Sequence, residues 1–126
     1  MDNYKHSETT DLILKCFYTV YNQLGYGFLE KVYEKAMFIE LRSLGLSVER
    51  QKQINVLYKQ QIVGEYYADL IVSEAVIIEI KAAESLCEAH EFQLINYLKA
   101  TEIEVGLLLN FGKTPQIKRK IFSNKF

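Results

Sequence analysis

The sequence is poor in cysteine and in proline, and both shortages exclude certain classes of protein. The only cysteines, Cys16 and Cys87, are too few for a disulfide framework and lack the paired spacing of a zinc site. A single proline, Pro115, with 49% hydrophobic and 25% charged residues, is typical of a globular chain and excludes a disordered one. We expect one domain, 1–126, that buries a core without a disulfide or a structural metal.

Long apolar runs and a strong net charge are also missing. No window approaches the roughly 18 apolar residues of a membrane span. The first residues also lack a basic segment followed by an apolar run, the pattern of a signal peptide. With so few cysteines, this predicts a cytoplasmic protein that is neither exported nor inserted into a membrane. A formal net charge of -1 argues against binding nucleic acid through a broad basic surface, so any such binding must be local.

One basic cluster lies in the last part of the chain. It comprises Lys113, Lys118, Arg119, Lys120 and Lys125. A solvated strand edge and tail explains such a cluster as well as contact with phosphate groups does. Both interpretations stay open on the sequence alone.

The hydrophobic pattern changes period along the chain and predicts an α/β fold. Eight elements are expected: helices at about 7–24 and 28–44, strands at 48–58, 62–72 and 75–81, a helix at about 85–100, and strands at 105–111 and 117–122. Helical spacing stops at glycines after the first two helices, and the strands are rich in Val, Ile and Tyr. The order α-α-β-β-β-α-β-β predicts a mixed sheet with helices packed on its faces.

The second expected helix is apolar over a wide arc. Two neighbouring stripes make up this arc: Leu29, Val32, Ala36 and Ile39, and beside them Tyr33, Met37 and Leu41. Glu30 lines up with the second stripe, at the N-terminal end of a face that otherwise looks directed to the core. An acid in that position is unexpected for a purely structural helix.

Charged residues interrupt the third expected strand, where the pattern favours apolar ones. Segment 75–81 has the composition of a strand buried on both faces until it reaches Glu79 and Lys81. Residues two apart point to the same face of a strand. Asp69 lies in an equally apolar setting on the preceding strand, and a tight turn at Ser73-Glu74 would lay it beside the third strand. The sequence therefore predicts that two acids and a lysine converge.

These residue types point to metal chemistry. Buried carboxylates that lie close together repel each other, and either a cation or a proton relieves that repulsion. Asp69, Glu79 and the main-chain carbonyl of Ile80 would form an oxygen ligand set for Mg²⁺ or Mn²⁺, completed by water and phosphate. A lysine is a poor general base, so Lys81 is expected to orient the attacking water and to stabilise charge on the phosphorane, while the metal acidifies the water.

A structural alternative explains the same three residues. Glu79 and Lys81 could form a weak surface pair at a solvated strand end, with Asp69 capping a turn. The spacing alone does not decide between this alternative and the metal site. The helices add Gln93 and Tyr97, which are four apart and share a face with Leu86 and His90. Each polar helix residue alone is explained by a position at a helix end or at the rim of the core. Together with the strand acids, these residues favour the metal site.

The segment Gly27-Phe28-Leu29-Glu30-Lys31-Val32-Tyr33 resembles the motif that names the GxxExxY protein family. Further blocks resemble that family in the same order over about 12–122: residues 66–72, the Ile-Glu-Ile-Lys at 78–81, His90 with 93–99, and 106–112. That family is similar to the PD-(D/E)XK nuclease superfamily, whose acid, spacer and Glu-x-Lys correspond to Asp69, Glu79 and Lys81. Ala68 stands where the name pattern has proline. Residues 93–97 also resemble the QxxxY helix motif of recombination-type exonucleases.

The resemblance implies a restriction-endonuclease-like fold and assigns roles to the site residues. It implies that Asp69, Glu79 and Glu30 act at a divalent metal, Mg or Mn, and that Lys81 is the catalytic lysine. It implies site-supporting or nucleic-acid-binding roles for a second group: Gln93, Tyr97, Tyr33 and His90.

Two functions follow from this assignment. The first is a metal-dependent deoxyribonuclease that hydrolyses phosphodiester bonds of DNA, or less readily of RNA. The second is a non-catalytic nucleic-acid- or protein-binding module that retains the nuclease fold, which the near-neutral charge and the short chain favour. A homodimer or a protein partner would then supply recognition surface. Tyr66 and Tyr67 are given no role, because strand tyrosines usually border the core.

Overall fold

A computed structural model describes residues 5–123 of the chain. Its elements are α1 (Ser7–Leu24), α2 (Glu30–Ser43), β1 (Val48–Tyr58), β2 (Gln61–Val72), β3 (Val76–Lys81), α3 (Glu88–Lys99), β4 (Val105–Phe111) and β5 (Pro115–Ile121). The predicted order of helices and strands is confirmed. The last strand begins two residues earlier than expected, because proline is tolerated as the first residue of an edge strand.

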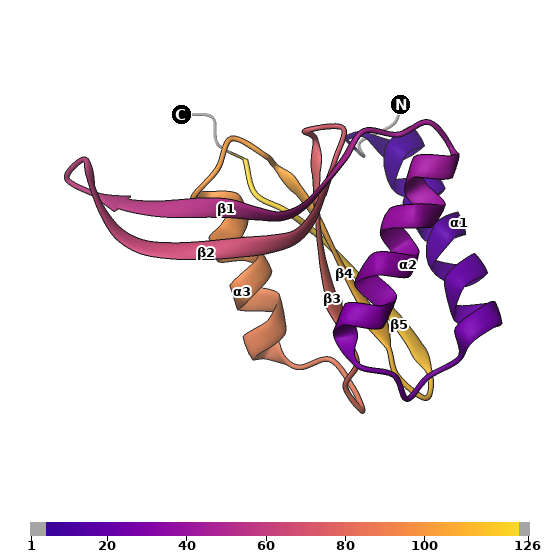
Figure 1. The fold of residues 1–126 in the computed structure, drawn as a ribbon. Helices are drawn as coiled ribbons and strands as arrows, with labels where there is room; N and C mark the ends of the chain where they lie inside the picture. The colour runs from indigo at the N-terminus through magenta and orange to yellow at the C-terminus, as the bar shows by residue number, and fades with distance from the viewer. Residues whose placement is uncertain (1–4, 124–126) are drawn as a thin grey trace.

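The five strands form one sheet in the order β1-β2-β3-β4-β5. All neighbours are antiparallel except β3 and β4, which are parallel and are connected through α3. Helices α1 and α2 cover one face of the sheet and α3 covers the other, while the long β1–β2 hairpin extends beyond the remaining strands (Figure 1). The expected tight connection is confirmed: Ser73 and Glu74 both have left-handed φ angles, and Ala75 N–H donates to Val72 O at 2.9 Å.

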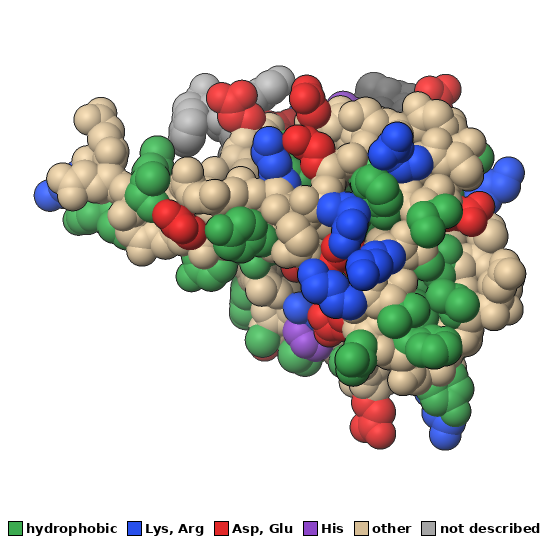
Figure 2. All heavy atoms as spheres, in the orientation of Figure 1, with side chains coloured by type: hydrophobic (Ala, Val, Ile, Leu, Met, Phe, Trp, Pro, Cys, Tyr) green, Lys and Arg blue, Asp and Glu red, His purple; other side chains and the backbone are tan. Residues whose placement is uncertain are grey.

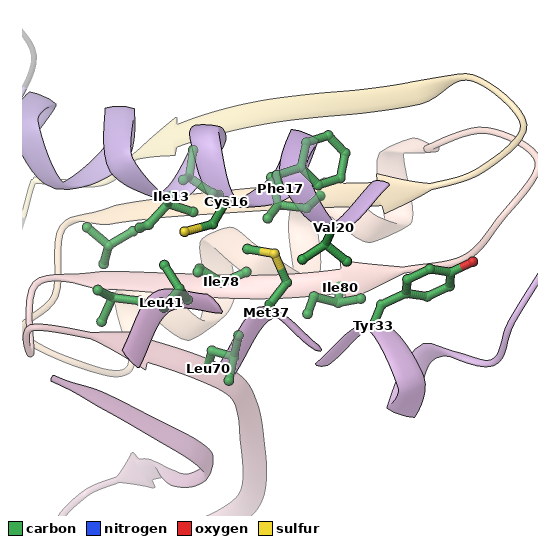
Figure 3. Packing of buried hydrophobic residues seen from close by; sticks show 14 of the residues in the cluster. Ile13, Cys16, Phe17, Val20, Tyr33, Met37, Leu41, Leu70, Ile78 and Ile80 are labelled. Carbon is green, nitrogen blue, oxygen red and sulfur yellow. The ribbon is translucent and has the colours of Figure 1, made fainter. Parts of the chain in front are cut away.

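Two hydrophobic clusters pack on the two faces of the sheet. The cluster under α1 and α2 contains Ile78 and Ile80 of β3, and Figure 3 shows these side chains packed against Met37 and its neighbours. The cluster under α3 contains Ile77 together with Leu94. Because side chains alternate along a strand, residues 79 and 81 share the α3 face with Ile77. The polar end of β3 therefore lies on the face that α3 covers.

Helix α2 buries only one of its two expected apolar stripes. Tyr33 and Met37 are fully buried, whereas Leu29 is 81% exposed and Ile39 is 67% exposed. The helix packs on α1 and the sheet from one side, and its outer side faces solvent within the described chain. Hydrophobic side chains gather at the lower right of Figure 2, over the α1–α2 connection and the first turn of α2.

No helix among residues 5–123 is long and apolar enough to span a membrane.

Candidate functional site

The main-chain ladder between β2 and β3 ends where two carboxylates meet. Paired residues run from Val72↔Val76 to Leu70↔Ile78, and the next pair in this register is Asp69 and Glu79. Here side chains replace the main-chain partners. Asp69 N–H donates to Glu79 Oε2 at 2.9 Å, and Ile80 N–H donates to Asp69 Oδ2 at 2.8 Å. The antiparallel register places the two acids opposite each other. This is the point where β2 leaves β3 to enter the long hairpin (Figure 1).

Both carboxyl groups lie in a poorly hydrated environment. Glu79 is 4% exposed, and burial together with the negative charge of Asp69 raises the pKa of Glu79 to about 8. Burial also raises the pKa of Asp69, although the hydrogen bond from Ile80 N–H opposes that rise. A buried acid, Glu79, and a half-buried one, Asp69, that resist ionisation side by side form a site where a divalent cation is favoured.

Lys81 shares the face of Glu79 and is held by a chain of hydrogen bonds. Lys81 Nζ donates to Gln93 Oε1 at 3.0 Å, and Gln93 Nε2 donates to the Tyr97 hydroxyl at 3.2 Å. Burial and the charge of Glu79 raise the pKa of Tyr97 to about 12, so this hydroxyl stays neutral. Within residues 5–123, Lys81 makes no ion pair within 4.0 Å. The arrangement therefore differs from a Glu79–Lys81 surface pair, and Asp69 bridges two strands and does not cap a turn.

A second acid of α2 reaches this network, and the sequence pattern did not single it out. Gln51 Nε2 donates to Glu34 Oε1 at 2.7 Å and to Asp69 Oδ1 at 3.3 Å. Glu34 is 3% exposed and also accepts from Arg50 Nε at 3.2 Å. Glu30, the predicted acid, is exposed in the first turn of α2, and its charge raises the pKa of both strand acids. The available signal was that Glu34 follows Tyr33 directly, at the edge of the apolar face.

The backbone at Gln51 is unusual for a strand. Gln51 has a φ of 50° and lies opposite Asp69, between the pairs Arg50↔Leu70 and Lys52↔Ala68. A left-handed conformation is rare for a residue with a side chain, and it is retained where the surrounding structure enforces it. Here it turns the Gln51 amide toward both acids.

The structure places Tyr33 away from the carboxylates and gives His90 a structural contact at the start of α3. Tyr33 is fully buried on the opposite face of the sheet, where its hydroxyl donates to Gly25 O at 2.8 Å and its ring stacks on Phe111 with centroids 4.2 Å apart. His90 Nδ1 accepts a hydrogen bond from Cys87 N–H at 3.2 Å and caps α3. These two side chains stabilise the elements that carry the site.

Positive charge gathers in one region of the face shown in Figure 2. In the orientation of Figure 1, Lys and Arg side chains gather beside acidic ones between the hairpin and α2 (Figure 2). Part of the basic cluster near the end of the chain has structural partners: Lys120 pairs with Glu91, and Arg119 Nη2 donates to Lys5 O at 2.7 Å. Lys125 lies outside the described residues.

The donor set fits a hard cation that retains much of its water. Among residues 5–123, no three His, Cys, Asp or Glu side chains gather into a complete ligand set. Mg²⁺ is commonly held by only one or two carboxylates, with water and phosphate completing its shell. Asp69 and Glu79 supply two carboxylates. The carbonyl of Ile80 points to the same side of β3 as its N–H, which bonds Asp69. Oxygen donors of this kind suit Mg²⁺ or Mn²⁺.

Residues 7–121 match the family model of the PD-(D/E)XK nuclease superfamily. The chain belongs to that superfamily, whose nucleases generally use divalent metals. The mixed sheet with helices on both faces is the restriction-endonuclease-like fold expected from the sequence. Assignment to the GxxExxY family within it stays a prediction.

A search of solved structures finds a likeness to the crystal structure of SSO0001. The TM-score is 0.57 and the sequences are 18% identical, a level that shows the fold alone. The alignment covers 94% of this chain but 61% of that one, so this chain spans less than two thirds of its length. No curated protein matches the sequence.

Proposed function

We propose that this chain is a single nuclease-like domain, 1–126, that hydrolyses phosphodiester bonds of DNA, or less readily of RNA, with a divalent metal. One observation carries the proposal: the half-buried carboxylate of Asp69 and the buried one of Glu79 replace the β2–β3 ladder, with Lys81 on the same face as Glu79. A cytoplasmic location is part of the proposal, because the two cysteines are free and suit a reducing compartment.

The chain's own residues would hold the metal and position the phosphate. Asp69, Glu79 and the Ile80 carbonyl would bind Mg²⁺ or Mn²⁺, with Glu30 close enough to act electrostatically. When bound, the metal would supply a water of lowered pKa and neutralise phosphate charge. Lys81, directed by Gln93, would donate to the phosphate oxygen on which negative charge develops. Because the Tyr97 hydroxyl fixes the Gln93 amide from its other end, the ammonium is held in one direction.

A non-catalytic binding module is the second candidate. It is favoured by the near-neutral charge and by the raised pKa of Glu79, which leaves the metal-free site largely protonated at neutral pH. In that case a homodimer or a protein partner would extend the recognition surface.

A cleavage assay separates the two candidates. Labelled linear double-stranded DNA, single-stranded DNA and RNA are incubated with purified protein and Mg²⁺ or Mn²⁺, beside Lys81→Ala. We expect the variant to lose on the order of 100-fold in rate, the effect typical of removing one charge-stabilising donor. Lys35→Ala, at an exposed lysine of α2, is the control and should cleave normally. Equal traces of cleavage in wild type and Lys81→Ala would indicate contamination and contradict the catalytic proposal.

A further inference from the structure

A groove of about 920 Å³ lies between the β1–β2 hairpin and α3. Three aromatic rings line it, those of Tyr66, Phe92 and Tyr97, together with three side-chain amides and one lysine, Lys99. None of the described residues lining the groove is acidic, although the chain contains 16 acidic residues. An anionic chain would therefore meet no negative charge on the groove wall itself.

The groove is continuous with the proposed catalytic site. Gln93 lines the groove and also accepts the hydrogen bond from Lys81. Tyr97 lines the groove too, and its ring centroid lies 5.8 Å from that of Tyr66, another lining residue. A molecule in the groove would consequently lie one side chain away from the catalytic lysine.

Two of the rings offer uncovered surface. Tyr66 is 48% exposed and Phe92 is 60% exposed. Aromatic faces in a groove bind nucleobases by stacking, which tolerates any sequence because every base has such a face. The amides beside the rings can donate to and accept from base edges.

We infer that this groove binds unpaired nucleotides and leads a single strand toward Asp69, Glu79 and Lys81, an inference that rests on the proposed function. In a duplex the base faces are covered by their neighbours, so exposed rings gain nothing from paired DNA. A single lysine in the lining gives little affinity for a duplex backbone, which is bound mainly through phosphate contacts. The favoured substrate is single-stranded DNA or the frayed or unpaired end of a duplex.

The chain supplies a matched pair of tyrosines for the test. Tyr66 and Tyr67 are adjacent on β2 and are each 48% exposed, but they point to opposite faces of the hairpin, and only Tyr66 is among the described residues lining the groove. Binding of fluorescein-labelled oligo-dT is measured by anisotropy in EDTA, where metal-dependent cleavage cannot occur. We expect Tyr66→Ala to weaken binding about tenfold, within the range for one stacked base, and Tyr67→Ala to change it less than about twofold.

Three further variants test whether misfolding is the cause. Tyr66→Phe keeps the ring and should bind as wild type does. Because the chain has no tryptophan, Phe92→Trp introduces a single reporter whose emission should fall when oligo-dT stacks on it, whereas Tyr67→Trp should show no such quenching. Circular dichroism should show that each variant is folded.

The outcomes separate this inference from the proposed function. Equal binding by Tyr66→Ala and Tyr67→Ala, or duplex binding as tight as single-strand binding, would overturn the inference while leaving metal-dependent cleavage intact. A change in sedimentation for Tyr66→Ala with unchanged oligo-dT binding would also overturn it, since the groove would then bind protein. Selective loss of oligo-dT binding in Tyr66→Ala supports the inference even if wild-type protein cleaves nothing, which would contradict only the nuclease proposal.

Discussion

The two faces of β3 show how one strand serves two purposes. Toward α1 and α2 it presents Val76, Ile78 and Ile80, which are all buried in the larger hydrophobic cluster. Toward α3 it presents Ile77 and then Glu79 and Lys81, the first buried in the smaller cluster and the other two in polar contacts. One face is explained by packing alone. The other gives up apolar contact and leaves a buried carboxyl with a raised pKa, a cost expected where a binding or catalytic site is built.

This comparison predicts opposite behaviour for substitutions on the two faces. Changes on the α1–α2 face should lower stability and leave chemistry unchanged. Changes at the polar residues beside α3, Asp69, Glu79 and Lys81, should remove metal binding or cleavage and leave the fold intact.

The largest effect is expected from Asp69→Asn, on β2 beside the polar face. Removing one of the two proposed carboxylate ligands should lower cleavage on the order of 1,000-fold, or about 4 kcal/mol of transition-state stabilisation. Saturating Mn²⁺ should raise the melting temperature of wild type at neutral pH, and should raise that of Asp69→Asn much less. Asp11→Asn, an exposed acid of α1, is the control and should respond as wild type does. No Mn²⁺-induced shift in wild type would count against the metal site.

The next effect concerns the packed face. Ile78 is fully buried, so Ile78→Ala should lower the free energy of unfolding by about 2–5 kcal/mol. Urea unfolding measures this loss, and Ile39→Ala, at a 67% exposed position of α2, should stay within about 0.5 kcal/mol of wild type. Cleavage per folded molecule should not change. A loss of cleavage in Ile78→Ala beyond its loss of folded protein would mean that the two faces are not independent.

A smaller effect follows from the protonation of Glu79. Burial and the charge of Asp69 raise its folded-state pKa from 4.5 to about 8. The folded protein holds this proton while the unfolded chain has lost it, so stability falls as the pH rises through that window. The contribution is fully present below the unfolded pKa and is lost as the pH passes the folded pKa.

Glu79→Gln should remove this dependence, because an amide cannot ionise. In EDTA the variant should melt several degrees above wild type near pH 8, with a much smaller difference near pH 5. Glu8→Gln, in the first turn of α1, should show no such difference. A wild-type protein that becomes more stable in EDTA between these pH values, relative to Glu79→Gln, would contradict the raised pKa.

The elements and the central pair of acids could be predicted because local patterns determine them. The change from helical to alternating period marks where strands begin, and the tight turn at Ser73-Glu74 fixes the β2–β3 register. Once that register is fixed, Asp69 must lie opposite Glu79. The spacing of Gln93 and Tyr97 likewise predicted that they share a face, and they are hydrogen-bonded to each other.

Glu34, Gln51 and the groove could not be predicted in the same way, because they depend on contacts between distant segments. Glu34 looks like a surface acid until Arg50 and Gln51 of β1 fold over it. The left-handed backbone of Gln51 has no sequence signature, since it occurs in a non-glycine residue within a strand. Tyr66 has a distinct role only because the hairpin places it beside α3.

The smallest predicted effects come from Tyr33 and Tyr97. The family resemblance assigned both the same kind of supporting role, but the structure places them on opposite faces of the sheet. Tyr33→Phe removes a hydroxyl that donates to Gly25 O and accepts from Phe28 N–H, so it should lower stability by about 1 kcal/mol and leave cleavage unchanged. Tyr97→Phe removes the acceptor that fixes the Gln93 amide, and therefore the direction of Lys81, so it should lower kcat severalfold with little change in stability. For both variants, urea unfolding measures the change in stability and cleavage rates measure the change in kcat. If Tyr33→Phe lowered kcat as much as Tyr97→Phe does, the α1–α2 face would belong to the chemistry, and the division between a packing face and a reactive face would have to be abandoned.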